Sequence, residues 1–304
     1  MPNEETSDWS LQTSLVHAGE RAPAPLPTPT ATPIYTSATY LFPSLAALET
    51  ASEADNSYTY IRHGNPTITA LENVVTVAER GVGATVYASG MAALHGALLA
   101  AATPRGSTAP APRVILAARD LYAATTVLMQ ELFASQGTKI ITCDMCDLDA
   151  VDAALAEHHP DLLMVEQISN PLLRVVDMQA LATRAHAAGA RLVVDNTIAT
   201  PILQQPLTLG ADLVVHSATK YFGGHGDTAG GVVVARTGLL RDTLRRQARL
   251  LGATLGPFEA QQILRGMKTL TLRVRQQCRS AAEIAAWLST HPEVSAVYYP
   301  GLAN

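Results

Sequence analysis

The chain contains the stretch Leu213-Val214-Val215-His216-Ser217-Ala218-Thr219-Lys220, an apolar run followed directly by polar side chains and a lysine. An unbroken apolar run predicts a strand that is buried on both faces of a sheet. Open α/β folds bind their ligands at the carboxyl edge of such strands, which is where Lys220 would lie. A lysine amine with a lowered pKa can form a Schiff base with an aldehyde. The alternative interpretation is an ordinary surface lysine at a strand end.

Similar apolar runs recur along the chain and alternate with segments of helical composition. The predicted strands are Ala84–Ala88, Arg113–Ala117, Lys139–Thr142, Leu162–Glu166, Arg191–Asp195, Leu213–Ser217 and Gly231–Ala235. The predicted helices between them are Met91–Ala101, Ala123–Ala134, Ala150–His158 and Met178–Ala188. This alternation predicts an α/β fold in which a mostly parallel, seven-stranded sheet lies between helices.

The two ends of the chain have different patterns. Residues 1 to 43 show no helical period, and the proline-rich stretch Ala22–Pro33 predicts an extended arm. After Ala235 the pattern becomes helical, with one long helix predicted over Pro257–Leu288 and a short strand over Val294–Tyr299. We expect an arm over residues 1–60, a large domain over 61–256, and a linking helix with the start of a truncated C-terminal domain over 257–304.

Composition restricts the class of protein. Hydrophobic residues make up 48% of the 304 residues and charged residues 15%, against about 25% charged residues in an average chain. So few charges predict wide packing or subunit interfaces, and therefore an oligomer. The formal net charge is −5, without a basic block that could neutralise a run of phosphates, so we expect no nucleic-acid partner.

The same composition bears on location and metal binding. The first residues are acidic, and no apolar run reaches the ~20 residues of a membrane span, so we expect a cytoplasmic protein without membrane contact. The three cysteines suit a reducing compartment. Cys143 and Cys146 are spaced like a redox or zinc pair, but no second pair follows, and we predict no metal site.

Two further strand ends bear polar residues. Asp195-Asn196-Thr197 follows a buried run, and its carboxylate could hold the protonated nitrogen of a pyridine ring, although an Asx turn or helix cap is the simpler alternative. Ala88-Ser89-Gly90-Met91 joins a strand to a helix, and its small residues would let N–H groups face a phosphate. With Lys220, these are the three attachments that pyridoxal 5'-phosphate (PLP) requires.

Longer motifs extend this interpretation over almost the whole chain. Ser217-Ala218-Thr219-Lys220-Tyr221, followed by Gly224-His225-Gly226-Asp227, resembles the signature of the Cys/Met-metabolism family of PLP enzymes. Matching motifs in the family's order are Val16-His17-Ala18-Gly19, Tyr60-Ile61-Arg62 with Asn65-Pro66-Thr67, Ser89-Gly90-Met91, Asp120-Leu121-Tyr122, Glu166 with Ser169-Asn170-Pro171, Val194-Asp195-Asn196-Thr197, Arg265-Gly266-Met267-Lys268-Thr269 and Tyr299-Pro300-Gly301-Leu302. The resemblance implies a fold-type I, aspartate-aminotransferase-like architecture, with residues 61–256 as the PLP-binding domain.

The resemblance also implies a role for each matching residue. Lys220 would bind the cofactor aldehyde, Asp195 would pair with the pyridine nitrogen, and Tyr122 would stack on the ring. The phosphate would be held by Gly90, Met91, Ser217 and Thr219, and Asn170 would hydrogen-bond the ring hydroxyl. Ser89 and Thr197 would also bind the cofactor. Tyr60 and Arg62 would reach the phosphate of the neighbouring subunit's cofactor. The resemblance therefore implies a homodimer with shared active sites, assembled into a homotetramer.

The implied activity is γ-replacement or γ-elimination on a homoserine-derived or sulfur-containing L-amino acid, as in trans-sulfuration for methionine and cysteine biosynthesis. Lys220, Tyr122 and Tyr60 would be the catalytic residues. Cystathionine γ-synthase and γ-lyase chemistry stay open, with O-acylhomoserine sulfhydrylase and methionine γ-lyase as alternatives. Ala123-Ala124 follows Tyr122 where methionine γ-lyases have a cysteine, which weakens that last assignment.

In the family, the segment Val294–Leu302 begins a C-terminal domain that supplies the arginine for the substrate's α-carboxylate. The chain stops at Asn304. We therefore expect it to bind cofactor but to be impaired on amino acids unless another polypeptide completes the site. A PLP-binding subunit without turnover is the alternative of a different class.

Overall fold

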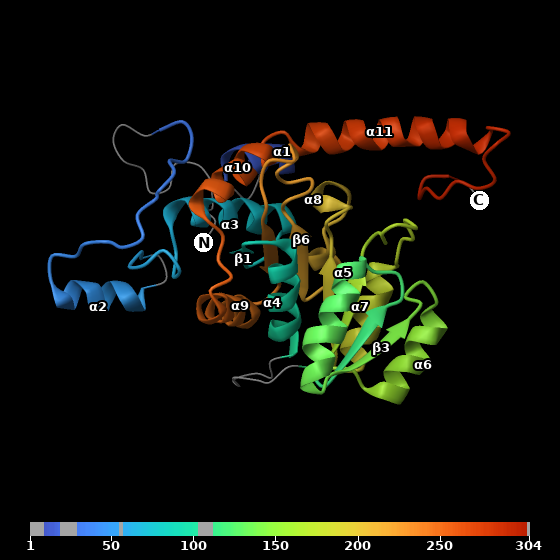
Figure 1. The fold of residues 1–304 in the computed structure, drawn as a ribbon, viewed down its shortest axis with the longest axis horizontal. Coiled ribbons are helices and arrows are strands. Elements are labelled where there is room, and N and C mark those ends of the chain that lie inside the picture. Colours follow the sequence, from blue (N-terminus) through green and yellow to red (C-terminus); the bar gives the residue numbers. More distant parts are fainter. Residues whose placement is uncertain (1–8, 19–28, 55–56, 103–111, 303–304) are drawn as a thin grey trace. The chain divides into compact units, whose positions relative to one another are not determined.

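The computed structural model describes residues 9–18, 29–54, 57–102 and 112–302 of the chain (Figure 1). The chain divides into two compact units. The first unit comprises Met1–Gly96 and His216–Lys268, and the second comprises Ala97–Val215 and Thr269–Asn304. The domain boundaries expected after residues 60 and 256 stay predictions. They rest on expected binding roles, whereas the two units are defined by how compactly the residues pack.

The predicted strands are confirmed, each to within one residue at either end. They are β1 (Gly83–Tyr87), β2 (Val114–Ala118), β3 (Lys139–Cys143), β4 (Leu162–Glu166), β5 (Arg191–Asp195), β6 (Leu213–Ser217) and β7 (Gly231–Ala235). The seven-stranded sheet has the order β1-β7-β6-β5-β4-β2-β3. Strand β6 passes from the second unit into the first at His216.

Strand direction and burial agree with the α/β prediction. In the second unit β2 runs parallel to β3 and β4, and β5 runs parallel to β4 and β6. In the first unit β1 pairs with β7 in the antiparallel direction. Every residue of β1, β4 and β7 is buried, whereas β3 lies at an edge and is partly exposed. Strands buried on both faces are apolar throughout, which is why the sequence locates them so closely.

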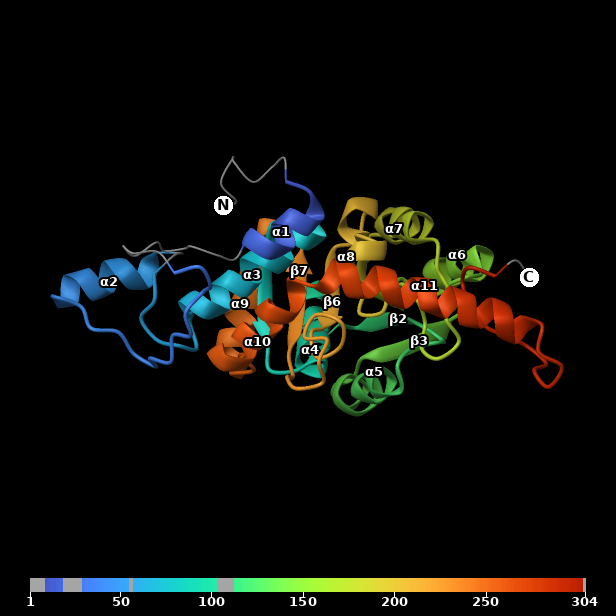
Figure 2. The same cartoon turned by 90° about the horizontal axis from the view of Figure 1, so that it is seen from above.

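The first unit is organised around helix α3. Its helices are α1 (Leu11–His17), α2 (Leu45–Glu53), α3 (Pro66–Glu79), α9 (Gly238–Leu251) and α10 (Pro257–Met267), and α4 (Gly90–Ala102) begins in this unit. Helix α3 packs against α1, α10 and β1 (Figure 2). Its N-cap is Asn65, whose Oδ1 accepts the Thr67 N–H group at 2.9 Å, and Pro66 occupies the first turn, where its missing N–H group is not needed.

The described part of the second unit has further helices, most of them shorter than α3. They are α5 (Ala123–Leu128), α6 (Leu148–His158), α7 (Met178–Ala187), α8 (Thr200–Leu203) and α11 (Leu270–Ser289). Helix α5 continues as a π-helical turn over Met129–Phe133 and a 3-10 turn over Ala134–Gln136, so the helix predicted over Ala123–Ala134 is helical with a change of type. Helix α7 packs on β5 and contacts α6.

Two predictions for the C-terminal part are wrong. The long helix predicted over Pro257–Leu288 is two helices, because Thr269 leaves helical geometry with φ −107° and ψ 5°. The buried positions continue at helical spacing through Met267 and Leu270, so the apolar pattern cannot reveal the interruption. The strand predicted over Val294–Tyr299 has no described partner strand, and it does not form.

The N-terminal prediction also needs correction. Residues 1 to 43 include helix α1, capped by the Ser10 hydroxyl, which accepts the Thr13 N–H group at 3.2 Å. The helix has 7 residues and buries Ser14 and Leu15, too few positions to establish a period. Residues 22–28 of the predicted arm and Gly19 lie outside the described residues.

Candidate active site

Strand β1 is joined to helix α4 by a short turn with unpaired backbone donors. The Ser89 hydroxyl accepts the Ala92 N–H group at 3.1 Å and so caps the helix. Gly90 packs so tightly that a β carbon there would lie 2.8 Å from the β carbon of Ser217. Within the described part of the chain, the N–H groups of Gly90 and Met91 have no hydrogen-bond partner. Two free donors at the positive end of a helix suit an anion.

Lys220 lies in the turn that follows β6. Its N–H group donates to the Ser217 carbonyl at 3.0 Å, its carbonyl accepts the Gly224 N–H group at 2.8 Å, and its side chain is exposed. The Thr219 hydroxyl donates to the Gly230 carbonyl at 3.2 Å and accepts the Gly230 N–H group at 3.0 Å. The turn is therefore fixed while the lysine amine is accessible. To donate to a phosphate, Thr219 would have to change partner.

A buried polar pair supports the end of β6. His216 Nε2 lies 2.7 Å from Glu79 Oε1, with the two side chains 1% and 0% exposed. The ring of Phe222 packs on the imidazole at a centroid distance of 4.5 Å. Because a buried polar bond is costly to break, this pair ties β6 to α3 just before the turn of Lys220. Sequence reasoning missed Glu79, whose partner is 137 residues away.

Tyr60 and Arg62 lie on a loop of the first unit that docks on α9. The Arg62 guanidinium lies 5.5 Å from the centroid of the Tyr60 ring, a cation–π distance. Arg62 also donates to the Arg249 carbonyl at 2.5 Å, and Arg249 donates in return to the His63 carbonyl at 3.3 Å. Tyr60 and Arg62 remain exposed. Their use by a neighbouring subunit stays a prediction.

In the second unit, a buried carboxylate brings two predicted site loops together. Glu166 Oε1 accepts the Tyr122 N–H group at 2.6 Å, and Glu166 Oε2 accepts the Asn170 N–H group at 3.0 Å. Glu166 is 6% exposed and ends β4, where its register partner on β5 is Asp195. Tyr122, Asn170 and Asp195 therefore surround one acidic side chain at the carboxyl edge of the sheet.

Asp195 forms the local turn that was the alternative interpretation of its motif. Its Oδ1 accepts the Thr197 N–H group at 2.9 Å, as in an Asx turn. Asn196 is buried and donates to the Gln204 carbonyl at 2.9 Å, which anchors the turn. The Asp195 side chain is half-buried at the sheet edge, and Tyr122 is exposed. A role of Asp195 and Thr197 toward a ring stays a prediction beside this structural one.

The electrostatics of this edge are dominated by Glu166. Burial is the main reason that its pKa is raised to about 7, and the charge of Asp195 raises it further. The two N–H groups that donate to Glu166 act in the opposite direction. Near neutral pH the Glu166 carboxyl group, which lies beside Asp195, is therefore partly protonated. Sequence reasoning noted Glu166 only as part of a motif.

Comparison with known proteins identifies the family. Residues 12–304 match the family described as Cys/Met metabolism PLP-dependent enzyme. The chain belongs to this family. It is 40% identical over 301 residues to "Cystathionine gamma-synthase 1, chloroplastic" of Arabidopsis thaliana, covering 98% of this chain and 52% of the relative. It is 38% identical to "L-methionine gamma-lyase" of Fusobacterium nucleatum subsp. polymorphum, covering 98% of this chain and 74% of that protein.

Solved structures of the Cys/Met-metabolism family give the same result. Cystathionine gamma synthase from Xanthomonas oryzae pv. oryzae, in complex with cystathionine, has a TM-score of 0.88 at 36% identity. The match covers 97% of this chain and 72% of the Xanthomonas chain. Fold-type I architecture is thereby confirmed for the part that this chain spans, which is about half the length of the Arabidopsis relative.

The family is PLP-dependent by description, and the residues of each unit fit the cofactor. In the first unit the unpaired N–H groups of Gly90 and Met91 suit its phosphate, and the accessible amine of Lys220 suits its aldehyde. In the second unit the Asp195 carboxylate suits a pyridinium nitrogen, and the exposed Tyr122 suits a ring face.

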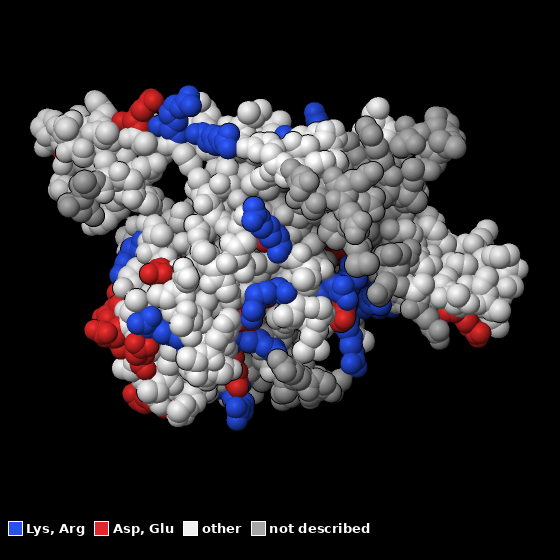
Figure 3. All heavy atoms as spheres, turned by 180° about the vertical axis from the view of Figure 1, so that it is seen from behind, with Lys and Arg blue, Asp and Glu red and all other residues white. Residues whose placement is uncertain are grey.

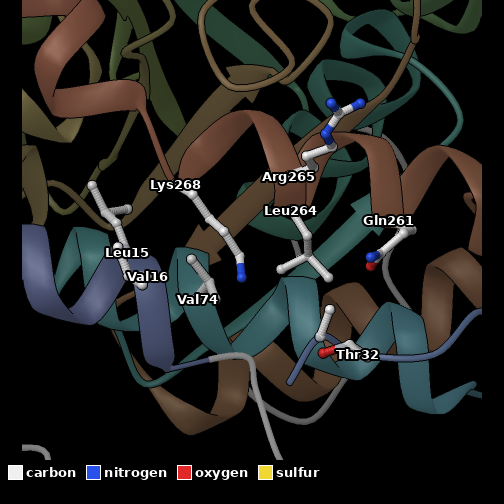
Figure 4. A pocket seen from close by; sticks show the side chains of 9 residues that line it. Leu15, Val16, Thr32, Val74, Gln261, Leu264, Arg265 and Lys268 are labelled. Atoms are coloured by element: carbon white, nitrogen blue, oxygen red, sulfur yellow. The ribbon is translucent and has the colours of Figure 1, made fainter. Parts of the chain in front are cut away.

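Two further features of the molecule are a cavity, which the predicted cofactor-binding residues do not line, and groups of basic side chains on the surface. A cavity of about 260 Å³ in the first unit is bordered by α1, α3 and α10, and none of its lining residues is a predicted site residue (Figure 4). On the face shown in Figure 3, basic side chains lie in small groups with uncharged surface between them. None of the described helices is both long and apolar enough to cross a bilayer.

Proposed function

We propose that the chain binds PLP and replaces or eliminates the γ-substituent of a homoserine-derived or sulfur-containing L-amino acid. Replacement by a thiol is better supported than elimination, because the Arabidopsis and Xanthomonas relatives are both named as γ-synthases. One observation supports the assignment most strongly: Asp195 at the end of β5 is the register partner of Val215, which precedes Lys220 by five residues. An acid for the ring nitrogen and a lysine for the aldehyde thus follow neighbouring strands.

PLP would be bound through its phosphate, its ring nitrogen and its ring face. The N–H groups of Gly90 and Met91, with the Ser217 hydroxyl, would hold the phosphate. The Asp195 carboxylate would keep a proton on the pyridine nitrogen, and the Tyr122 ring would lie against the cofactor face. When bound, PLP supplies an electron sink that stabilises negative charge developing on the substrate.

Proton transfer is assigned to Lys220. With the substrate amine bound in its place, the Lys220 amine would be free to remove a proton from the substrate's α carbon. After passing that proton on to the bound cofactor, the same amine would remove a β proton, so that the γ-substituent can leave with its bonding electrons. A thiol that adds at the γ carbon completes replacement, whereas water releases a 2-oxo acid and ammonia in elimination. Tyr122 and Tyr60 would assist these proton transfers.

Product analysis tests the proposal. The purified chain with PLP is incubated with O-acyl-homoserine and cysteine, and separately with cystathionine alone. Replacement predicts cystathionine from the first mixture. A 2-oxo acid and ammonia from cystathionine alone would assign elimination instead. Bound cofactor without product in either mixture would contradict turnover and favour a PLP-binding subunit.

A lysine comparison tests the covalent attachment separately. Lys220→Ala should remove the visible absorption band of the bound cofactor. Lys139→Ala is the matched control, because Lys139 is an exposed lysine that begins β3 of the second unit and should leave the band unchanged. Loss of the band in both variants, or in neither, would contradict the assignment.

A further inference from the structure

We infer that Glu166 is a positioning residue, whose buried carboxylate holds the backbones of Tyr122 and Asn170 at one fixed separation. This inference rests on the proposed function, which assigns Tyr122 to the cofactor ring, and on the ring-hydroxyl role that the family resemblance implies for Asn170. Glu166 ends the fully buried strand β4 and is itself 6% exposed. A carboxylate in such a place costs free energy unless its oxygens accept hydrogen bonds.

The two oxygens of Glu166 are used for two different loops. Oε1 accepts the Tyr122 N–H group at 2.6 Å from the loop after β2, and Oε2 accepts the Asn170 N–H group at 3.0 Å from the loop after β4. Because each N–H group has its own oxygen, a side chain with a single acceptor oxygen keeps only one of the two bonds. Both donors belong to the backbone, so only a change of Glu166 itself can remove these bonds while leaving Tyr122 and Asn170 in place.

A second connection ties the same two loops from Arg174. Its guanidinium donates to Asp120 at 2.8 Å, two residues before Tyr122, and to Asp144 at 2.8 Å. Its N–H group donates to the Ser169 hydroxyl at 3.0 Å, and its carbonyl accepts the Ser169 N–H group at 2.9 Å. Arg174 holds the outer ends of the loops, and Glu166 holds them beside Asp195. Two independent connections leave the loops little freedom to separate.

The alternative is that Glu166 merely stabilises the fold, and a matched variant separates the two roles. Asp161 also accepts two backbone N–H groups, those of Arg113 at 2.6 Å and Val114 at 3.0 Å. It lies just before β4, at the opposite edge from Glu166. One oxygen, Oδ2, accepts both of these N–H groups, so Asn would keep the acceptor, whereas Asp161→Ala removes it without touching the Tyr122 and Asn170 loops.

The test uses the full chain and three measurements: the thermal midpoint, the PLP dissociation constant, and the visible circular dichroism of bound PLP. A carboxamide has one acceptor where two are needed, so Glu166→Gln should weaken PLP binding about tenfold and reduce the dichroism. Glu166→Asp, which retains both acceptor oxygens, should recover part of the affinity. Asp161→Ala should lower the thermal midpoint while both cofactor readouts stay unchanged. An unchanged dissociation constant and dichroism in Glu166→Gln would overturn the inference.

Amide hydrogen exchange provides a measurement that needs no variant. In the unaltered chain without PLP, the amides of Tyr122 and Asn170 should already exchange slowly. Fast exchange that slows only when PLP is added would overturn the inference, because the cofactor would then order the loops. Failure of the unaltered chain to bind PLP would instead contradict the proposed function, and the cofactor-free exchange result would still decide the role of Glu166.

Discussion

Gly90 is a residue of the phosphate turn that leaves no room for a side chain. A β carbon at this position would lie 2.8 Å from the Ser217 β carbon. Gly90→Ala should therefore lower the free energy of unfolding by about 1–3 kcal/mol through overpacking. It should also weaken PLP binding, because the N–H groups of the turn would shift. Urea unfolding and a PLP titration measure the two effects.

Gly238 provides the control for this substitution. Like Gly90 it is the first residue of a helix in the first unit, but a β carbon there would meet nothing nearer than 4.0 Å. Gly238→Ala should leave both measurements unchanged or slightly increase stability. Equal effects of the two variants would show that close packing at Ser217 is not the cause.

Glu72 makes stability depend on pH. Burial raises its pKa from 4.5 to about 7, against the opposing charge of Arg245, whose Nη2 lies 4.0 Å from Oε2. Because the folded chain binds this proton more tightly than the unfolded chain, the stabilisation is complete below pH 4.5 and is lost as the pH rises through 7. The loss amounts to about 3 kcal/mol at most.

Two variants of this pair test the sign in urea unfolding at a series of pH values. Glu72→Gln should remove its part of the decline between pH 4.5 and 7. Arg245→Met should extend the decline above pH 7, because Arg245 holds the pKa of Glu72 down. Stability that rises over this interval in the unaltered chain relative to Glu72→Gln would contradict the assignment.

At the residue scale, the sequence predicts groups with a fixed local motif better than groups with distant backbone partners. Lys220 and Asp195 follow apolar runs, and the structure places both at strand ends. Glu166 is different, because its partners are N–H groups, which every residue except proline has. No residue type marks a backbone donor, so its role is visible only in coordinates. Glu79 was missed for a related reason, since it meets His216 through the fold.

At the scale of elements, the N-cap residue of α3 also anchors the segment that contains Tyr35. Asn65 is fully buried; its Oδ1 caps the helix, and its Nδ2 donates to the Tyr35 carbonyl at 2.6 Å. Asn65→Ala should cost about 2–4 kcal/mol, because it removes the cap and leaves the Tyr35 carbonyl without this donor. Asn65→Ser retains a cap acceptor without placing an oxygen against the Tyr35 carbonyl and should cost less, as measured by denaturant unfolding.

Asp177 of α7 is the matched control for a cap alone. Its exposed side chain accepts the Ala180 N–H group at 3.0 Å. Asp177→Ala should cost about 1 kcal/mol, the usual cost of losing a cap. If Asn65→Ala costs no more than Asp177→Ala, the bond to Tyr35 adds nothing to stability.

Elements differ in how much of their structure the sequence predicts. Strands buried on both faces have continuous apolar runs, so β4, β5, β6 and β7 begin and end at the predicted residues. The helix interruption at Thr269 is invisible, because buried positions on both sides keep helical spacing. The strand predicted over Val294–Tyr299 failed because local β propensity cannot supply a partner strand.

At the scale of the whole molecule, the family resemblance leaves one prediction that only an assembly can test. Tyr60 and Arg62 are exposed in the structure and are proposed to serve the neighbouring subunit's cofactor, whereas Lys220 and Asp195 serve their own. Arg62→Ala and Lys220→Ala should each be impaired alone. A mixed dimer would contain one site with both residues unaltered, since the symmetric arrangement pairs each subunit's loop with its partner's site. Random reassociation makes half of the dimers mixed, each with one working site of two, so roughly a quarter of the unaltered activity should return.

The control mixture for this experiment combines Lys220→Ala with Asp195→Ala. Both residues are proposed to belong to the same subunit's site, so no mixed dimer contains an intact one, and activity should stay absent. Product formation from O-acyl-homoserine and cysteine is measured before and after the variants are dissociated and reassociated together. Recovery in the Arg62 mixture alone supports shared sites. Recovery in neither mixture would contradict shared sites, because Arg62 would then serve the cofactor of its own subunit.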